Sequence, residues 1–398
     1  MSSKRMVRAI AALGLAAVTL PWLMSCAVNP VTGEKELTLV SEAQERQLGQ
    51  KNYGPYRQAQ GGDFVLDPAL VRYVQDVGQK VARHADRKLP YEFRVVNDGT
   101  PNAWALPGGK IAINRGLLTE LDSEAELAAV LSHEVVHSAA RHSAQSIERD
   151  LFFQGALAAA GMVLGDSAYA QAGMLGAQLG TAAGQQYYSR EAEREADKYG
   201  ISYMVRAGYD PQAAVELQQT FVRLSEDKSP GWLSGLFASH PPSPERVETN
   251  RRLVAQLGNP AGERGEARYR QALARLQRAQ PAYEAYDEAR TAFGKKRYQQ
   301  AMTLVEKAIR IEPEEALFHT LRGQIEEARG NDRAALRDFD RALALNPGYY
   351  RIPLARGLLQ RQMGRSEAAR SDLERSNALL PTAEAHYGLG LIAVSYTH

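Results

Sequence analysis

Residues 123–147 read SEAELAAVLSHEVVHSAARHSAQSI, and His133 and His137 lie four residues apart within them. Apolar residues recur at helical spacing through this run, and Ser123 with Glu126 forms a capping box at its start, so the run predicts a helix. Two residues four apart project from one face of a helix. Two neutral imidazoles placed in this way can bind one Zn²⁺, with Glu134 as the general base on a metal-bound water. The run therefore predicts a catalytic zinc site, although two histidines at this spacing also occur on helices that hold no metal.

Length and composition limit the classes of protein that this chain can belong to. Its 398 residues are too many for one typical domain, so two or three domains are expected. A formal net charge of +2 argues against nucleic acid as the main partner. Apolar residues make up 44% of the chain, enough for a large core, and its single cysteine excludes an intrachain disulfide.

The N-terminus has the pattern of a secretory signal. Lys4, Arg5 and Arg8 precede the apolar run AIAALGLAAVTLPWLM, which is shorter than a bilayer-spanning helix and ends before Ser25 and Cys26. The ending LMSC resembles the lipobox of bacterial lipoproteins. Residues 1–26 are therefore expected to be a lipoprotein signal peptide, with Cys26 as the lipidated first residue of the mature protein. The alternative is an ordinary signal peptide or anchor with an incidental cysteine.

Two helices and a small sheet are expected before the histidine motif. Helical patterns begin at Ser41 and Asp67, and YEFRVVN at 91–97 alternates like a strand. NAWAL and KIAIN flank a Pro107-Gly108-Gly109 turn, and this arrangement predicts a strand pair. The edge of such a sheet can receive an extended substrate by strand addition, so residues 102–106, with Asn102, Ala103 and Trp104, and residues 110–114 are candidates for that edge. The alternative is a hairpin that only packs on the helices.

Residues 151–186 are small, apolar and glycine-spaced, with Asp166 and Ser167 interrupting them. They leave no clean span of 18 apolar residues, so two closely packed helices are expected. A hairpin that inserts into a membrane is the alternative.

A third zinc ligand is needed, and the stretch SREAEREAD at 189–197 offers carboxylates on a further predicted helix. The spacing alone leaves several candidates open, namely Glu191, Glu193, Glu195 and Asp197. Glu193 and Asp197 share a helix face, so one can bind the metal while the other accepts the N–H of a ligating histidine.

Together these motifs resemble the gluzincin family of the CAAX prenyl proteases, in its soluble periplasmic, BepA-like branch. The similarity extends from about Cys26 to Val394 and includes CAVNPVTG, NAWALPGG, HEVVH, SREAEREAD and SHPPSPER. The resemblance implies that Glu193 is the third zinc ligand. It also implies that Asp197 is a catalytic residue beside Glu134, as the carboxylate that accepts from a ligating histidine.

The same resemblance gives His240 a role. It implies that this histidine lies near the metal and occupies its open position, which would close the site, because a catalytic zinc needs that position for water. The alternative is a helix-entry residue stabilised by the prolines that follow. Arg246 is expected to add charge near the site. His142 lies one turn beyond the motif and off its face, so it is expected to be exposed.

Residues 281–398 show a period of 34. Three groups of residues recur in phase, namely Pro313, Pro347 and Pro381; Ala301, Ala335 and Ala369; and the pairs Gly323 with Gly357 and Gly330 with Gly364. This period with small residues at helix contacts is typical of tetratricopeptide repeats. His319 and His386 are expected on the repeat surface. The final run HYGLGLIAVSYTH begins a helix without its partner, so the repeats are expected to be truncated at the C-terminus.

The sequence thus predicts an α+β, mainly α protein. A helical zinc metallopeptidase domain with a small β-sheet (27–257) is expected to precede a linker and connecting helix (258–280) and an all-α repeat solenoid (281–398). The resemblance implies a zinc endopeptidase, lipid-anchored in the periplasm at the outer membrane, which degrades unfolded or stalled outer-membrane proteins and whose repeats contact the assembly machinery. The alternative is a chaperone or scaffold for outer-membrane protein assembly with little proteolysis.

Overall fold

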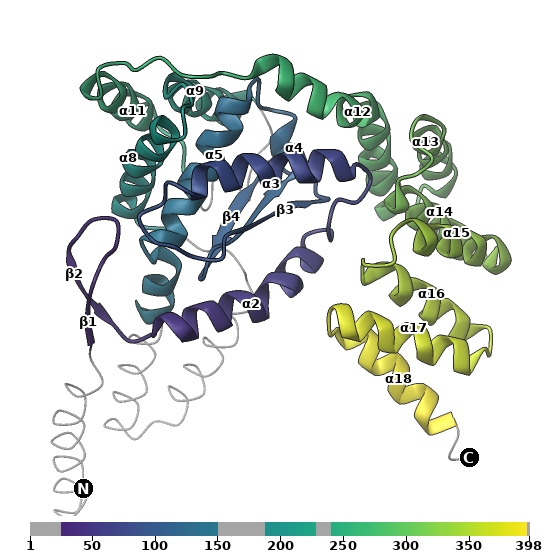
Figure 1. Ribbon diagram of the computed structural model, residues 1–398. Helices are drawn as coiled ribbons and strands as arrows, with labels where there is room; N and C mark the ends of the chain where they lie inside the picture. Colours follow the sequence, from purple (N-terminus) through teal and green to yellow (C-terminus); the bar gives the residue numbers. More distant parts are fainter. Residues whose placement is uncertain (1–24, 150–187, 228–239, 396–398) are drawn as a thin grey trace, which may run out of the picture.

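The computed structural model describes residues 25–149, 188–227 and 240–395 (Figure 1). A helical part around a small sheet is followed by an arc of helix pairs, and the long helix α12 joins the two. The first part contains β1 (Ser25–Val28), β2 (Lys35–Thr38), α2 (Glu42–Ala59), α3 (Pro68–Ala82), β3 (Glu92–Val96), β4 (Ala103–Leu106), β5 (Lys110–Asn114), α4 (Arg115–Leu118), α5 (Glu124–Ala139), α8 (Arg190–Arg206), α9 (Gln212–Asp227) and α11 (Pro244–Gln256). After α12 (Glu266–Gly294) come α13 (Tyr298–Ile311), α14 (Ala316–Ala328), α15 (Asp332–Leu345), α16 (Arg351–Gln362), α17 (Ser366–Leu379) and α18 (Ala383–Ser395). The expected α+β, mainly α fold class is confirmed.

The three-stranded sheet has the order β3-β5-β4. β4 and β5 form the expected antiparallel pair, and Gly108 and Gly109 between them have φ angles of 77° and 84°, which only glycine adopts without strain. β3 pairs parallel with β5. The expectation that residues 110–114 form an edge is wrong, because β5 lies in the centre of the sheet. β4 is an edge strand of this sheet.

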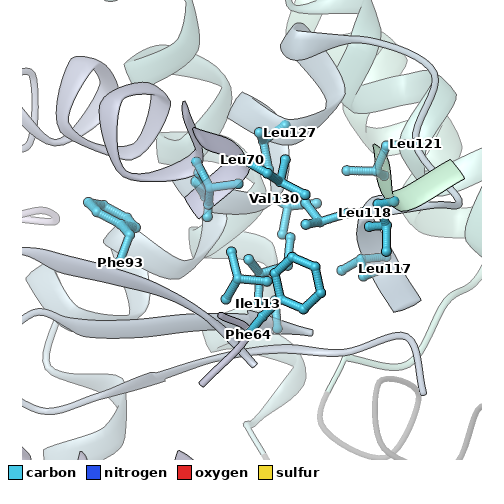
Figure 2. Close-up of a cluster of buried hydrophobic side chains, with 14 of the residues drawn as sticks. Phe64, Leu70, Phe93, Ile113, Leu117, Leu118, Leu121, Leu127 and Val130 are labelled. Carbon is cyan, nitrogen blue, oxygen red and sulfur yellow. The ribbon is translucent and has the colours of Figure 1, made fainter. Parts of the chain in front are cut away.

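The motif helix α5 is buried along almost its whole length. Apolar side chains from α3, the sheet and the segment before α5 surround it in one cluster, which Figure 2 shows around Leu70, Ile113 and Val130. Leu127 and Leu131 of α5 are 0% exposed. Each such side chain contributes about 1.5–3 kcal/mol when it is buried, so this core holds the helix firmly in place.

The repeat period appears as stacked antiparallel helix pairs. The three in-phase alanines, Ala301, Ala335 and Ala369, are each 0% exposed, and they lie on α13, α15 and α17. Gly323 on α14 packs against Phe339, where a Cβ would lie 2.6 Å from the ring. Small residues at a period of 34 therefore allow close contact within the pairs, and the tetratricopeptide prediction is confirmed.

The repeats pack against the first part rather than lying apart from it. Tyr269 of α12 donates to the Leu118 carbonyl at 2.6 Å, and the amide of Gln58 on α2 donates to the Gly348 carbonyl at 2.7 Å. The boundary expected at residue 281 lies inside α12, which continues unbroken through Pro281. One helix therefore belongs to both the connecting segment and the first repeat pair.

Two expectations on repeat histidines have different outcomes. His386 is exposed, as expected. His319 is buried, and its Nε2 lies 2.9 Å from the Pro313 carbonyl, so the expectation of a surface position is wrong. The face of α14 that carries His319 is covered within the repeat stack.

Two expected features lie outside the described residues, namely the signal peptide up to residue 24 and the helix pair at 151–186. Cys26 lies in β1, whose backbone pairs antiparallel with β2. Within the described ranges, no helix combines the length and apolar character that crossing a bilayer requires.

Candidate metal centre

α5 presents both motif histidines to one point. The Ser123 hydroxyl caps the helix by accepting from the Glu126 N–H at 3.1 Å, which confirms half of the predicted capping box. The Glu126 carboxylate accepts from the N–H of Asp122 instead of Ser123. One turn apart further along the helix, His133 Nε2 lies 3.1 Å from His137 Nε2. The two ring nitrogens therefore converge as the helical spacing predicts.

α8 brings Glu193 to the same point. Ser189 caps this helix through the Ala192 N–H, and Gly200 lets it approach α5 so closely that a Cβ there would lie 3.3 Å from the His133 backbone nitrogen. Glu193 Oε1 lies 3.3 Å from His137 Nε2. Of the four carboxylates that the spacing left open, the structure places Glu193 beside both histidine nitrogens.

His240, from the segment that leads into α11, completes the group. Its Nδ1 lies 3.2 Å from His133 Nε2 and 2.9 Å from Glu193 Oε1. Its Nε2 lies 3.4 Å from Glu134 Oε1. The donor atoms of His133, His137, Glu193 and His240 all lie within 4.8 Å of one another.

These spacings fit a tetrahedral metal ion. Ligand atoms about 2.1 Å from such an ion are separated from one another by roughly 3.4 Å. The distances between the nitrogens are 3.1 and 3.2 Å, and those from the two Glu193 oxygens to the three histidine nitrogens are 2.9, 3.3 and 3.5 Å, so they lie around that value. Three imidazoles and one carboxylate are also the ligand types that Zn²⁺ prefers, so the residues fit a zinc ion.

The pKa shifts of His133, Glu193 and His137 also indicate that a cation is favoured at this point. Burial alone would lower the pKa of His133, but Glu193 and Asp197 outweigh it and raise this pKa to about 10. Burial alone would raise the pKa of Glu193, but His240 and His133 outweigh it and hold this pKa well below the usual range. Burial lowers the pKa of His137 well below its usual value, so this imidazole is neutral. The site therefore contains a carboxylate, a neutral ligand and a retained positive charge where a divalent cation would bind.

Asp197 stands behind His133. Its Oδ1 lies 3.1 Å from His133 Nδ1, and its two oxygens accept from Arg246 at 2.7 and 2.8 Å. Arg246 Nη1 also lies 3.0 Å from Glu193 Oε2. Burial would raise the pKa of Asp197, but Arg246 and then His133 outweigh it and lower this pKa. The charge expected from Arg246 is thus part of a buried pair that fixes Asp197.

Glu134 faces the same point without a fixed partner for one of its oxygens. Its side chain is buried, and Oε2 has no hydrogen-bond partner among the described residues. Burial raises its pKa. Glu134, His240 and apolar side chains such as Val130 and Leu217 line a cavity of about 30 Å³, which is large enough for a water molecule.

The expectation that His142 is exposed is wrong. α5 ends at Ala139, and Arg141 adopts a left-handed φ of 64° before the next helical turn begins. The helix is interrupted there, and His142 lies with its Nδ1 2.9 Å from His137 Nδ1 and is only 4% exposed. A continuous helix would have pointed it away, and the residue types near Arg141 carry no signal for this conformation, since glycine is the usual choice.

The sheet edge near the site is already in contact with other residues. Ala103 lines the cavity beside Glu134, whereas Trp104 lies on the opposite face, with its ring 5.9 Å from that of Tyr53. The Ala105 carbonyl accepts from the hydroxyls of Ser143 and Tyr188 at 3.1 and 3.2 Å. Of the three residues expected at the edge, Asn102, Ala103 and Trp104, the structure brings Ala103 to the cavity.

Residues 68–254 match the model of peptidase family M48. By this similarity we refer to the stretch as the M48 domain. It begins with α3 and ends within α11, so it contains the motif helix, α8 and the His240 segment. The four residues that converge at the candidate metal centre therefore all lie inside the matched part.

Curated relatives of the M48 domain come from bacteria and mitochondria. The chain is 31% identical over 211 residues to the beta-barrel assembly-enhancing protease of Escherichia coli (strain K12), and this match covers 51% of the chain and 43% of that protein. It is 31% identical over 226 residues to the mitochondrial metalloendopeptidase OMA1 of Schizosaccharomyces pombe, covering 55% of the chain and 63% of that protein. The chain thus spans less than half the length of its Escherichia coli relative.

The repeats resemble solved tetratricopeptide domains. One is the structure described as "First TPR of Spaghetti (RPAP3) bound to HSP90 peptide SRMEEVD", at 24% identity and a TM-score of 0.30. The match covers 30% of this chain and 96% of the solved domain.

Proposed function

We propose that the chain is a zinc-dependent endopeptidase, with His133, His137 and Glu193 as the zinc ligands and Glu134 as the general base. The observation that carries the proposal is the convergence of these side chains from two helices onto one point beside a cavity of about 30 Å³. When bound there, zinc supplies a Lewis acid that polarises a carbonyl and lowers the pKa of water.

The protein's own residues divide the remaining work. Glu134 takes the proton of the attacking water and passes it to the leaving amine, and its burial, which raises its pKa, suits it to carry that proton. Asp197 accepts from His133 Nδ1 and so directs Nε2 of that ring toward the site. Arg246 keeps Asp197 in this position.

His240 restrains the site in this proposal. Its Nδ1 is within 3.2 Å of two of the three ligands, in the place that a water would need. Water and substrate can enter only after His240 moves away, so the peptidase is closed until a substrate or partner displaces this residue.

The proposed substrates are unfolded or stalled outer-membrane proteins in the periplasm. The name of the Escherichia coli relative, beta-barrel assembly-enhancing protease, supports these proposed substrates. Cys26 is proposed to carry the lipid that anchors the chain at the outer membrane. The repeats are proposed to contact substrates or the assembly machinery, and a cavity of about 600 Å³ between them and the M48 domain, lined by residues such as Thr100, Tyr286 and Arg351, offers room for a bound segment.

An extended substrate is proposed to add to the sheet beside β4, near Asn102 and Ala103. The edge position of β4 and the place of Ala103 in the cavity wall support this path. Such a segment has to displace the Tyr188 and Ser143 hydroxyls from the Ala105 carbonyl.

Cleavage of unfolded casein by the purified chain tests the activity. We expect cleavage with zinc, none after chelation, and recovery when zinc is added back.

His240→Ala should raise the rate of casein cleavage severalfold, because it removes the fourth ligand, and an unchanged rate would contradict closure by this residue. Absence of zinc from the purified wild type, together with no cleavage, would sink the peptidase proposal.

A chaperone or scaffold function is the second candidate, and the same His240 contact favours it, since a closed site cleaves little. Glu134→Gln separates the two candidates in cells. Full outer-membrane assembly with this variant supports the scaffold, whereas loss of function with trapped, uncleaved substrate supports the peptidase.

A further inference from the structure

The two motif histidines are held from behind by different partners. His133 Nδ1 lies 3.1 Å from Asp197, a carboxylate in direct contact. His137 Nδ1 instead lies 2.9 Å from Nδ1 of His142, whose Nε2 lies 3.1 Å from Glu195 Oε2. A carboxylate therefore stands behind each ring, directly in one case and through a second imidazole in the other.

We propose that His142 and Glu195 form a positioning relay that fixes the tautomer and orientation of His137 and tightens its hold on zinc. The inference rests on the proposed metal site but concerns residues outside its ligand set. Neither His142 nor Glu195 touches the point where the four ligand atoms converge.

The direction of each hydrogen bond follows from the groups at the ends. The Glu195 carboxylate only accepts, so His142 Nε2–H is the donor in that contact. The Nδ1 atoms of His142 and His137 lie 2.9 Å apart, so one proton is shared between them, and with the His142 proton on Nε2 that shared proton belongs to His137 Nδ1. His137 Nε2 is left with its lone pair free, and it faces Glu193 and His133 at 3.3 and 3.1 Å. The opposite arrangement would place the His137 proton on Nε2 and block its use as a ligand.

Packing keeps the relay in one geometry. The Tyr188 ring stacks on His137, with centroids 3.8 Å apart and planes at 19°. His142 is almost fully buried, and it follows the left-handed residue Arg141, which interrupts the helix. The Arg141 side chain is itself fixed by Glu45, which accepts from its Nε at 2.9 Å. These contacts stabilise the orientation in which the two rings face each other.

Glu195 is the outer end of the relay, and it is 34% exposed in its side chain. It lies on α8, the helix that also carries Glu193 and Asp197, so one helix supplies a ligand and the carboxylate behind each motif histidine. Three of the five residues of the stretch EREAD, at 193–197, therefore supply a carboxylate to the metal centre or to a residue behind it.

The test is the zinc dissociation constant of the full chain, measured by competition with a chromophoric chelator. Removing a hydrogen-bond partner of a ligating histidine weakens metal binding by about 10–100-fold. We expect that loss for His142→Leu, which cannot accept from His137. His142→Asn should recover most of the affinity, because its Oδ1 takes the place of Nδ1. Glu195→Leu should fall between these two variants.

Glu191→Gln is the matched control, since Glu191 is an exposed residue of the same helix whose ion pair is with Arg194, on the surface. It should bind zinc like the wild type. Equal affinity of the wild type, His142→Leu and Glu195→Leu would overturn the relay, as would a loss in His142→Leu that His142→Asn does not reverse.

Thermal unfolding of the zinc-free variants separates positioning from folding. A lower Tm with an unchanged zinc affinity would assign His142 a structural role only and overturn the proposal. If the wild type itself bound no zinc, the proposed function would fail together with the relay. If the wild type bound zinc and the variants matched it, the relay alone would fail.

Discussion

Both halves of the molecule contain ion pairs between arginine and a carboxylate, and the two halves use them differently. In the repeats, the pair Arg322–Asp338 returns 34 residues later as Arg356–Asp372, with Nε–oxygen distances of 3.0 and 2.7 Å. In the M48 domain, Arg246–Asp197 occurs beside the candidate metal centre and is also in contact with Glu193. A pair that recurs with the structural period serves the stacking of helices, whereas a pair outside any period, next to ligands, serves a site.

The largest expected effect is a loss of activity at Glu134, which lies in the M48 domain beside the Arg246–Asp197 pair but forms no ion pair with an arginine among the described residues. Glu134→Gln keeps the size of the side chain and removes the base, so kcat should fall by about 10²–10⁴-fold. Zinc content and the free energy of unfolding should stay close to wild type, because burial already raises the pKa of this carboxyl. Casein cleavage with metal analysis checks both, and retained activity would remove Glu134 from the mechanism.

Substitution of Arg246 and of Arg322 tests directly whether the two kinds of ion pair differ. Arg246→Met leaves Asp197 and Glu193 buried without their cation, which should cost about 3–5 kcal/mol of unfolding free energy. Arg322→Met, in a pair with 30% exposure of the arginine, should cost about 1 kcal/mol. Urea denaturation of both variants measures the difference, and equal losses would show that the two pairs are not distinct in kind.

Gly323 tests whether the period of small residues stabilises the repeats. Gly323→Ala forces a Cβ to within 2.6 Å of Phe339, so the free energy of unfolding should fall by about 1–3 kcal/mol. Gly390→Ala on α18 meets no atom within 4 Å and should raise it by up to about 1 kcal/mol. Thermal unfolding of the pair gives the sign of each change, and a gain at Gly323 would contradict the close contact.

Glu126 gives the smallest effect, and it depends on pH. Burial raises its pKa from 4.5 to about 6, so the folded state prefers the protonated carboxyl. The resulting stability is fully present below pH 4.5 and is lost as the pH rises through 6, by about 1–2 kcal/mol. Glu126→Gln should lose less stability than the wild type between pH 4.5 and 7. Parallel curves from urea titrations would show that this carboxyl is not perturbed.

The features that the sequence predicts well depend on local spacing. His133 and His137 converge because a helix places residues four apart on one face. The alanines that recur every 34 positions, Ala301, Ala335 and Ala369, are buried where the helices of the repeats pack. Spacing leaves several candidates for the third ligand, and the family resemblance selects Glu193. Spacing alone cannot do so, because the approach of α8 to α5 depends on the contact of Gly200 with the backbone of His133.

The features that the sequence does not predict depend on single backbone conformations or on non-local pairing. A helix that continues through Arg141 predicts an exposed His142, and no local pattern signals the left-handed φ of Arg141 that interrupts it. The central position of β5 follows from its pairing with β3, which lies earlier in the chain and forms no hairpin with it. His319 is buried by the repeat stack, and its own helix gives no sign of that cover.

The N-terminal strands end at the same turn that places His142. Asn29 donates to the Ala140 carbonyl at 3.3 Å, and the Val40 carbonyl accepts from Arg141 at 2.6 Å. A mechanical pull on Cys26, where the lipid anchor is proposed, would therefore be transmitted through these bonds to the end of α5. One short piece of backbone, at Ala140 and Arg141, therefore both positions His142 and receives the N-terminal strands.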